Sequence, residues 1–224
     1  MALLLTIDTA VQSASVCLSD NGEVIDELVN PSEKDSASWL HVAIEKILAE
    51  KYLQLQDLKA IAVSAGPGSY TGLRVGMAAA KGLCYALKIP LITVNTLQMM
   101  AAAVESPTTD LLCPMIDARR MEVFTALYNS SLQEVLPSTN LILETGSFEQ
   151  WLTKHTITFL GNGSIKAQPL ITHLNAKFVT VKATASHMVK LAANKFEQAQ
   201  FSDLAYTEPF YGKDFHSPVS TKFY

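Results

Sequence analysis

The sequence predicts an α/β protein of two lobes, built by duplication, with a cleft between them. Apolar strands alternate with amphipathic helices along the chain, a pattern typical of mixed sheets flanked by helices. A strand that ends in an aspartate and turns into a second strand occurs twice, at Asp8 and at Asp117. A polar, proline-containing break lies between the two occurrences, at residues 105–110. We therefore expect lobes at 1–105 and 106–224, with the tail from about residue 201 packing back on the first lobe.

Composition excludes several classes of protein. The chain has 224 residues, of which 49% are hydrophobic and 17% charged, so it can bury a sizeable core. A formal net charge of −4 argues against autonomous binding of nucleic acid, which is typical of basic domains. The three cysteines lie in apolar runs, which indicates buried free thiols rather than a disulfide framework. No segment at the start reads as a leader or a membrane span, so we expect a cytoplasmic protein.

The first half opens with three antiparallel strands. Residues 3–7, 13–18 and 24–29 are apolar or alternating, and Asp20-Asn21-Gly22 is a strong hairpin turn. Asp35 or Ser36 can cap a helix that ends near residue 52, with its apolar stripe at i, i+3 and i+4. A strand at 61–64, a helix at 73–87, a strand at 91–94 and a helix at 96–104 complete the lobe.

The stretch 60–87 is the centre of this half. A buried strand stops at Gly66-Pro67-Gly68, and a helix restarts with Ser69 or Thr71 as its N-cap. Small residues lie four apart along one face of this helix, and glycine inside a helix costs about 1 kcal/mol relative to alanine. A second helix approaching closely would explain that cost. We therefore expect a partner-binding face formed by Gly72, Arg74, Gly76, Ala80 and Leu83.

The glycine-rich loop before this helix matches neither common phosphate-binding motif. A P-loop requires lysine and a hydroxyl residue directly after its last glycine, whereas Leu73 and Arg74 follow Gly72. The dinucleotide fingerprint fails as well, because the third glycine is one position late and no acidic residue stands about 20 positions on. A tight structural turn and an anion site both remain open.

The second half repeats the opening pattern. Strands are expected at 111–116, 121–128 and 132–136, followed by a helix at 147–154 and a strand at 156–160. A tight loop at 161–164, a strand at 177–181 and a helix at 184–198 complete the lobe. If the two opening turns face each other, the cleft would carry residues of a vestigial nucleotide site: Asp8, Thr9, Gly66, Gly68, Ser69, Asp117, Gly161 and Gly163. For Asp8 and Thr9, turn capping is the competing interpretation.

No set of residues in the sequence has the spacing of a metal site. Among the five histidines no two are four apart, and the His41–Glu45 pair is the nearest approach to a helical ligand pair. We expect no metal site, no catalytic residues and no cofactor of the chain's own.

The motif Ser-Ala-Gly-Pro-Gly-Ser-Tyr-Thr-Gly-Leu-Arg-Val-Gly at 64–76 closely resembles the bacterial TsaB (YeaZ) family. Weaker matches support it at 7–10, 116–119, 122–124, 161–163 and 209–211. The resemblance implies an actin-like, ribonuclease H-like duplication, the architecture of sugar kinases and heat-shock-chaperone ATPases.

The resemblance further implies a non-catalytic subunit of tRNA threonylcarbamoyladenosine synthesis. Such a subunit would support a TsaD-like transferase through helix packing, beside a TsaE-like ATPase, with ATP or ADP and the metal held by the partner subunits. Contact with tRNA would be made only through the complex, and the isolated chain could pair with itself.

Two alternatives belong to other classes. A sugar-kinase-like, ATP-dependent phosphotransferase would need small residues beside the nucleotide phosphates, whereas Arg119 and Arg120 stand there. A metallopeptidase would need metal ligands for which the sequence offers no candidates.

Overall fold

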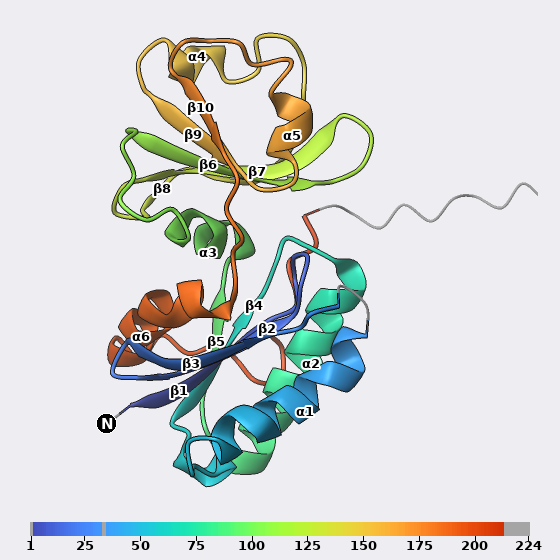
Figure 1. The fold of residues 1–224 in the computed structure, drawn as a ribbon, viewed down its shortest axis with the longest axis vertical. Helices are drawn as coiled ribbons and strands as arrows, with labels where there is room; N and C mark the ends of the chain where they lie inside the picture. Colours follow the sequence, from blue (N-terminus) through green and yellow to red (C-terminus); the bar gives the residue numbers. More distant parts are fainter. Residues whose placement is uncertain (1, 33–34, 213–224) are drawn as a thin grey trace, which may run out of the picture.

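The computed structural model describes residues 2–32 and 35–212. The chain forms two five-stranded mixed sheets, one in each lobe, stacked along the long axis of the molecule (Figure 1). Three strands of each sheet form an antiparallel meander, and two further strands add in parallel beside the first strand of that meander.

The first sheet has the order β3-β2-β1-β4-β5. Its strands are β1 (Leu3–Asp8), β2 (Ser15–Asp20), β3 (Glu23–Val29), β4 (Ala60–Ser64) and β5 (Leu91–Val94). Strands β1 and β4 are buried along their whole length, which explains their continuous apolar runs. Asn21 and Gly22 have positive φ angles in the turn between β2 and β3, as the hairpin motif predicts.

The second sheet has the order β10-β9-β6-β7-β8 and repeats the topology of the first. Its strands are β6 (Leu111–Asp117), β7 (Glu122–Asn129), β8 (Glu134–Ile142), β9 (Ile157–Leu160) and β10 (Ala176–Val179). The repeated strand order confirms the duplication predicted from the two strand-aspartate-turn patterns.

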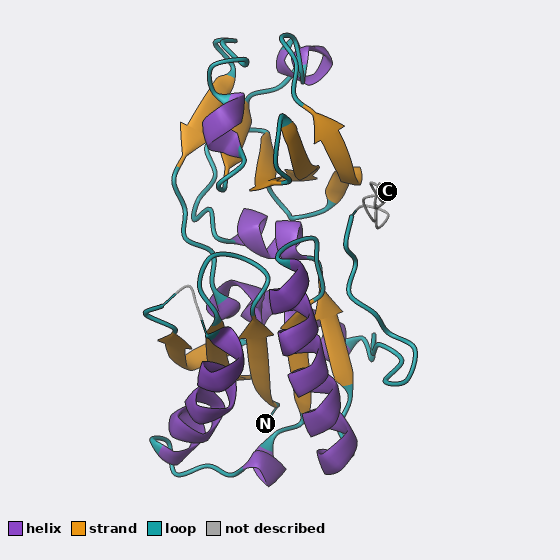
Figure 2. Cartoon of the chain, turned by 90° about the vertical axis from the view of Figure 1, so that its right-hand side faces the viewer, coloured by secondary structure: helices purple, strands orange, loops and turns teal. Residues whose placement is uncertain are grey.

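Helices cover both faces of the first sheet. On one face lie α1 (Ser36–Ala49) and α2 (Tyr70–Leu87), which Figure 2 shows side by side in front of the strands. On the other face lie α6 (Val189–Glu197), the short helix η2 (Ala185–Met188) and α3 (Thr96–Ala102). The turn η1 (Leu55–Asp57) precedes β4.

The second lobe carries only short helices, α4 (Glu149–Leu152) and α5 (Ser164–Ala167). They occupy the crossovers where α1 and α2 stand in the first lobe. The helix expected at 147–154 is shorter in the structure, where α4 forms a single turn.

The second lobe, expected to span 106–224, ends earlier in the structure. After β10 the chain returns to the first lobe, where η2 contacts β1 and β2, and α6 contacts β5. The described tail continues on the first lobe, since the Ser202 N–H donates to the Leu91 carbonyl and the Phe210 N–H donates to the Ala65 carbonyl. The second lobe thus comprises roughly the segment from β6 to β10.

Candidate functional site

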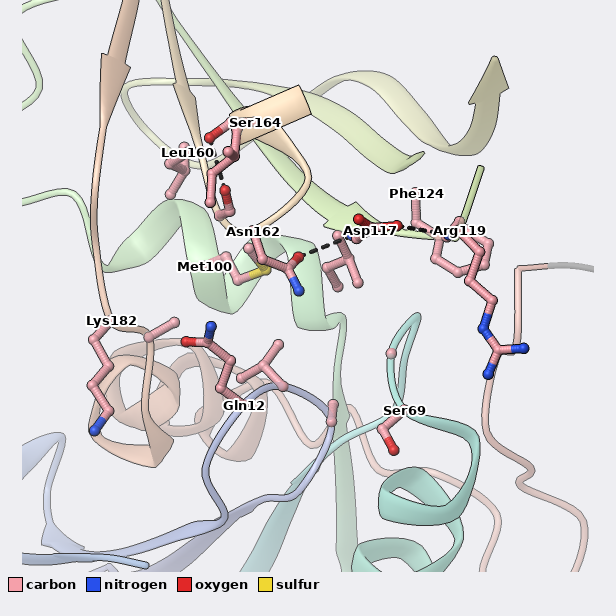
Figure 3. A pocket seen from close by; sticks show the side chains of 18 of the residues that line it. Gln12, Ser69, Met100, Asp117, Arg119, Phe124, Leu160, Asn162, Ser164 and Lys182 are labelled. Atoms are coloured by element: carbon pink, nitrogen blue, oxygen red, sulfur yellow. Dashed lines mark hydrogen bonds between the residues drawn. The ribbon is translucent and has the colours of Figure 1, made fainter. Parts of the chain in front are cut away.

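The cleft between the lobes forms a cavity of about 1470 Å³. The first lobe lines it with the turn after β1 (residues 10–13) and the start of α2. The second lobe lines it with the turn after β6 (residues 116–120), the loop after β9 and the segment 179–183. In Figure 3, Gln12 lies on the first-lobe side of this cavity and Asn162 on the second-lobe side.

Asp8 does not face the cleft, contrary to the expectation from sequence. Its side chain is fully buried beneath the turn, where Oδ1 accepts hydrogen bonds from the Ser64 hydroxyl at 2.6 Å and the Ala10 N–H at 2.9 Å. The second oxygen, Oδ2, has no partner among the described residues. Desolvation raises the pKa of Asp8 to about 6. A carboxyl group in this position supports the turn and is not placed to hold a ligand in the cavity.

Thr9 and Gly66 are likewise part of the framework. The Thr9 hydroxyl donates to the Gly72 carbonyl at 2.7 Å, which ties the turn after β1 to the first turn of α2. Gly66 has a φ of 107° and precedes a cis peptide bond to Pro67. A Cβ atom at Gly66 would overlap the Phe210 carbonyl, so this glycine is required by the returning tail.

Gly68 and Ser69 do line the cleft. Ser69 is the N-cap of α2, and its hydroxyl accepts the Gly72 N–H at 3.2 Å. Its own N–H donates to the Ala10 carbonyl at 2.8 Å. The loop is thus a tight turn that is closed on itself and on the neighbouring turn.

Asp117 lines the cleft from the second lobe but is engaged there. Lys166 Nζ lies 2.9 Å from its Oδ1, and the Arg119 N–H donates to the same oxygen at 2.7 Å. The hydrogen bond from Lys166 lowers the pKa of this carboxyl group. Gly161 lines the cavity, whereas Gly163 packs below it, against Ile116 and Val123. Of the eight expected cleft residues, the structure therefore places four on the cavity: Gly68, Ser69, Asp117 and Gly161.

The small residues of α2 face inward, so the partner face expected from them is wrong. Gly72, Gly76 and Ala80 are buried, and a Cβ atom at Gly72 or Gly76 would overlap Thr9. The helix that these glycines allow to approach closely is α2 itself, against the turn after β1. Arg74 is exposed and Leu83 is half-buried, so these two members of the expected set remain accessible.

The outward face of α2 carries other small residues. Ala78 and Gly82 are exposed, and nothing lies within 4 Å of a Cβ atom built at Gly82. Tyr85 on this helix and Val42 on α1 are 79% and 63% exposed. Sequence reasoning missed this face because its glycine and alanine are spaced like those of the buried face.

Arg74 is fixed at the start of this outward face. Its Nε donates to the Tyr211 hydroxyl at 3.0 Å, and its guanidinium lies 4.0 Å from the centre of the Tyr70 ring. Lys81, two turns further, donates to the carbonyls of Ala205 and Thr207. The tail thereby covers one flank of α2.

The described residues contain no cluster of three or more side chains from histidine, cysteine, aspartate and glutamate that could hold a metal ion. The three cysteines are free and buried, as expected, and burial raises the pKa of each thiol. Among the described helices, none combines the length and the apolar character needed to cross a membrane.

These features define an actin-like protein with duplicated lobes and an inter-lobe cleft. The family model described as "TsaD: tRNA N6-adenosine threonylcarbamoyltransferase" matches residues 23–216, and the chain belongs to that family. The resemblance to its TsaB (YeaZ) members, inferred above from the motif at 64–76, is confirmed.

Among its relatives is the tRNA threonylcarbamoyladenosine biosynthesis protein TsaB of Bacillus subtilis, which is 36% identical over 62% of this chain and 62% of that protein. Alignments with the first three curated TsaB proteins span 54–62% of their lengths. The solved structure of YeaZ from Pseudomonas aeruginosa has a TM-score of 0.82 at 24% identity, covering 94% of this chain and 100% of that one. The activator of 2-hydroxyisocaproyl-CoA dehydratase from Clostridium difficile, with bound ADPNP, has a TM-score of 0.50 at 8% identity, covering 89% and 96%.

Proposed function

We propose that this chain is a non-catalytic subunit that supports a TsaD-like transferase in the synthesis of tRNA threonylcarbamoyladenosine in the cytoplasm. The observation that carries the proposal is the outward face of α2, which we define as Arg74, Ala78, Gly82 and Tyr85. It offers small residues flanked by an exposed aromatic ring. A groove of about 290 Å³, lined by α1 and residues 53–55, reaches α2 at Leu83. Such a face suits a packed helix from another chain.

The relatives support the reaction, since TsaB of Bacillus subtilis carries the name of a tRNA threonylcarbamoyladenosine biosynthesis protein. The non-catalytic role is supported by the state of the two aspartates that end β1 and β6. Asp8 is buried, and Asp117 is paired with Lys166, so neither is free to act on a substrate. ATP, ADP and metal would then be bound by the TsaD-like and TsaE-like partners, and tRNA would be contacted through the complex.

The dehydratase activator with bound ADPNP keeps a phosphotransferase as the alternative function, because it shares the fold. The burial of Asp8 argues against a phosphotransferase, because this carboxyl group does not face the cleft. Magnesium-dependent ATP hydrolysis by the purified chain, abolished by Asp8→Asn, would favour the phosphotransferase over the subunit.

The test places a bulky residue on the outward face with Gly82→Leu. We expect the variant to keep its fold, because the site is open, and to lose affinity for a TsaD-like subunit at least about tenfold, or about 1.4 kcal/mol. Product formation in a reconstituted reaction should fall with it. The control is Asn194→Leu, which adds the same side chain at an exposed position of α6, on the opposite face of the sheet. A folded Gly82→Leu variant with unchanged affinity for the TsaD-like subunit would contradict the proposal. If the isolated chain associates with itself through the same face, Gly82→Leu should weaken that association as well.

A further inference from the structure

The charge of the inter-lobe cleft is opposite in sign to that of the whole chain. The protein has a formal net charge of −4, yet the cavity is lined by four cationic side chains and two carboxylates. The cationic ones are Arg74, Arg119, Arg120 and Lys182, and the carboxylates are Asp117 and Glu122. The low-dielectric walls of a cavity strengthen the electrostatic potential that such a local excess of positive charge creates.

Both carboxylates are already engaged. Asp117 is held by Lys166, and Glu122 Oε2 accepts a hydrogen bond from Asn140 Nδ2 at 2.9 Å. Arg74 is occupied in part by Tyr211 and Tyr70. The side chains of Arg119, Arg120 and Lys182 make no hydrogen bond or ion pair with residues 2–32 or 35–212. Three cations of the cleft are therefore available to a ligand.

The two arginines occupy unusual backbone positions. Arg119 and Arg120 have φ angles of 67° and 49°, in the left-handed region that favours glycine or asparagine. The turn is held by the bonds from the Arg119 N–H to Asp117 and from Lys166 Nζ to the Arg120 carbonyl at 2.9 Å. Positive φ angles are typical of short connections between antiparallel strands, here β6 and β7. The hairpin turn thus places both arginines on the lining of the cavity.

The interior of the cavity is different in character. Met100, Ile116, Leu160 and Phe124 supply apolar walls, and Gln12 and Asn162 project amide groups between them (Figure 3). Arg119 and Lys182 lie on opposite sides of this interior in the same view. Ligand pockets typically combine such apolar walls with a few placed polar groups.

We propose that the inter-lobe cleft binds a small organic anion, whose apolar or aromatic body lies between the lobes and whose phosphate or carboxylate group is held by Arg119 and Arg120. The guanidinium groups neutralise the anion directly, because the two carboxylates that line the cleft among the described residues already accept from Lys166 and Asn140. Arginine suits this role, since its planar fork matches both anions. The two arginines belong to the second lobe, and the cleft shares only Arg74 with the outward face of α2 as defined above. Binding of a small anion to the isolated chain can therefore be tested without a partner protein.

The experiment titrates the purified full chain with three fluorescent probes that share one aromatic body: 1-naphthyl phosphate, 1-naphthoate and neutral 1-naphthol. Each titration is run with excess magnesium and with a chelator. We expect saturable binding of at least one anionic probe, several-fold tighter than that of 1-naphthol and unchanged by magnesium. The phosphate and carboxylate arms show which anion the arginines prefer.

The variants replace each arginine by glycine, which also suits the positive φ angles, so the turn should remain folded. We expect Arg119→Gly/Arg120→Gly to weaken the anionic probe at least about tenfold, and each single variant to weaken it less. The matched control is Lys88→Gly, which also removes one positive charge at a residue with a positive φ angle, here 57°. Lys88 follows the last turn of α2, about 27 Å along the helix from the end that lines the cleft. That control should bind like the parent chain.

The proposal is overturned if no anionic probe binds saturably, if 1-naphthol binds as tightly, or if binding requires magnesium. Unchanged affinity in the folded double variant also overturns it, because the anion would then lie elsewhere. A melting curve for every variant separates loss of the site from loss of the fold.

Discussion

Gly76 lies on the buried face of α2, whereas Gly82 lies on its exposed face. A Cβ atom at Gly76 would overlap the Thr9 hydroxyl, which is itself fixed to the Gly72 carbonyl, and would lie close to Val63. A Cβ atom at Gly82 meets nothing within 4 Å. Gly76 therefore lets α2 pack closely on the turn after β1, whereas Gly82 leaves an open surface.

This contrast predicts opposite effects of one substitution. Gly82→Ala should stabilise the protein by up to about 1 kcal/mol, because alanine is the better helix former. In Gly76→Ala the same gain is set against overpacking, which typically costs about 1–3 kcal/mol. Urea unfolding of both variants checks this. Equal stability of the two variants would show that the Thr9 contact gives way without cost.

Asp8 predicts a dependence of stability on pH. Its pKa is about 6 in the folded protein, against an ordinary value of 3.8, so between these values the folded state binds more protons than the unfolded state. Stability from this group is therefore fully present below about pH 4 and is lost as pH rises toward 6 and beyond. At about 1.4 kcal/mol per pKa unit, the loss between about pH 4 and pH 7 amounts to about 2–3 kcal/mol.

Asp8→Asn removes this titration while keeping an oxygen to accept from Ser64 and Ala10. Urea unfolding across the same pH range should show the difference in stability between parent and variant shifting in favour of Asp8→Asn as pH rises. A pH-independent difference would mean that Asp8 is not buried as an acid.

At the scale of helices and strands, local patterns predicted most of what the structure shows. The β2–β3 hairpin and the N-cap at Ser69 follow from residues that are adjacent in sequence. The antiparallel neighbours β1-β2-β3 and β6-β7-β8 follow from the repeated opening pattern. These features depend on short-range chemistry, which a sequence displays directly.

Long-range contacts were not predictable in the same way. Which face of α2 is buried depends on Thr9, more than 60 positions away, and both faces carry small residues. Asp8 was expected in the cleft because it ends a strand at the right edge, but its side chain turns inward to Ser64. The pair Arg119 and Arg120 was noticed in the sequence only as an obstacle to nucleotide binding, since φ angles cannot be read from residue names.

At the scale of the whole molecule, an apolar cluster shared by both lobes lies between the two clusters that belong to one lobe each. A single cluster of buried residues includes Leu4 and Ala62 of the first sheet and Leu112 and Tyr128 of the second. Helix α3 contributes Leu97 and Met100 to that cluster and contacts β6, β7 and η2. The tail adds a further link, because Gly212 lies against Phe124 of β7 while Phe210 is bonded to Ala65.

This shared cluster predicts that the lobes unfold together, although each has its own sheet. The two tryptophans report the lobes separately, because Trp39 packs on the core beneath α1 and Trp151 packs on that of the second lobe. In Trp151→Phe the remaining fluorescence follows the first lobe, and in Trp39→Phe it follows the second. Within each variant, we expect the urea midpoint from fluorescence to coincide with that from circular dichroism, which follows both lobes at once. A fluorescence transition that separates from the circular dichroism transition in either variant would show that the contacts through α3 and the tail are too weak to couple the two halves of the duplication.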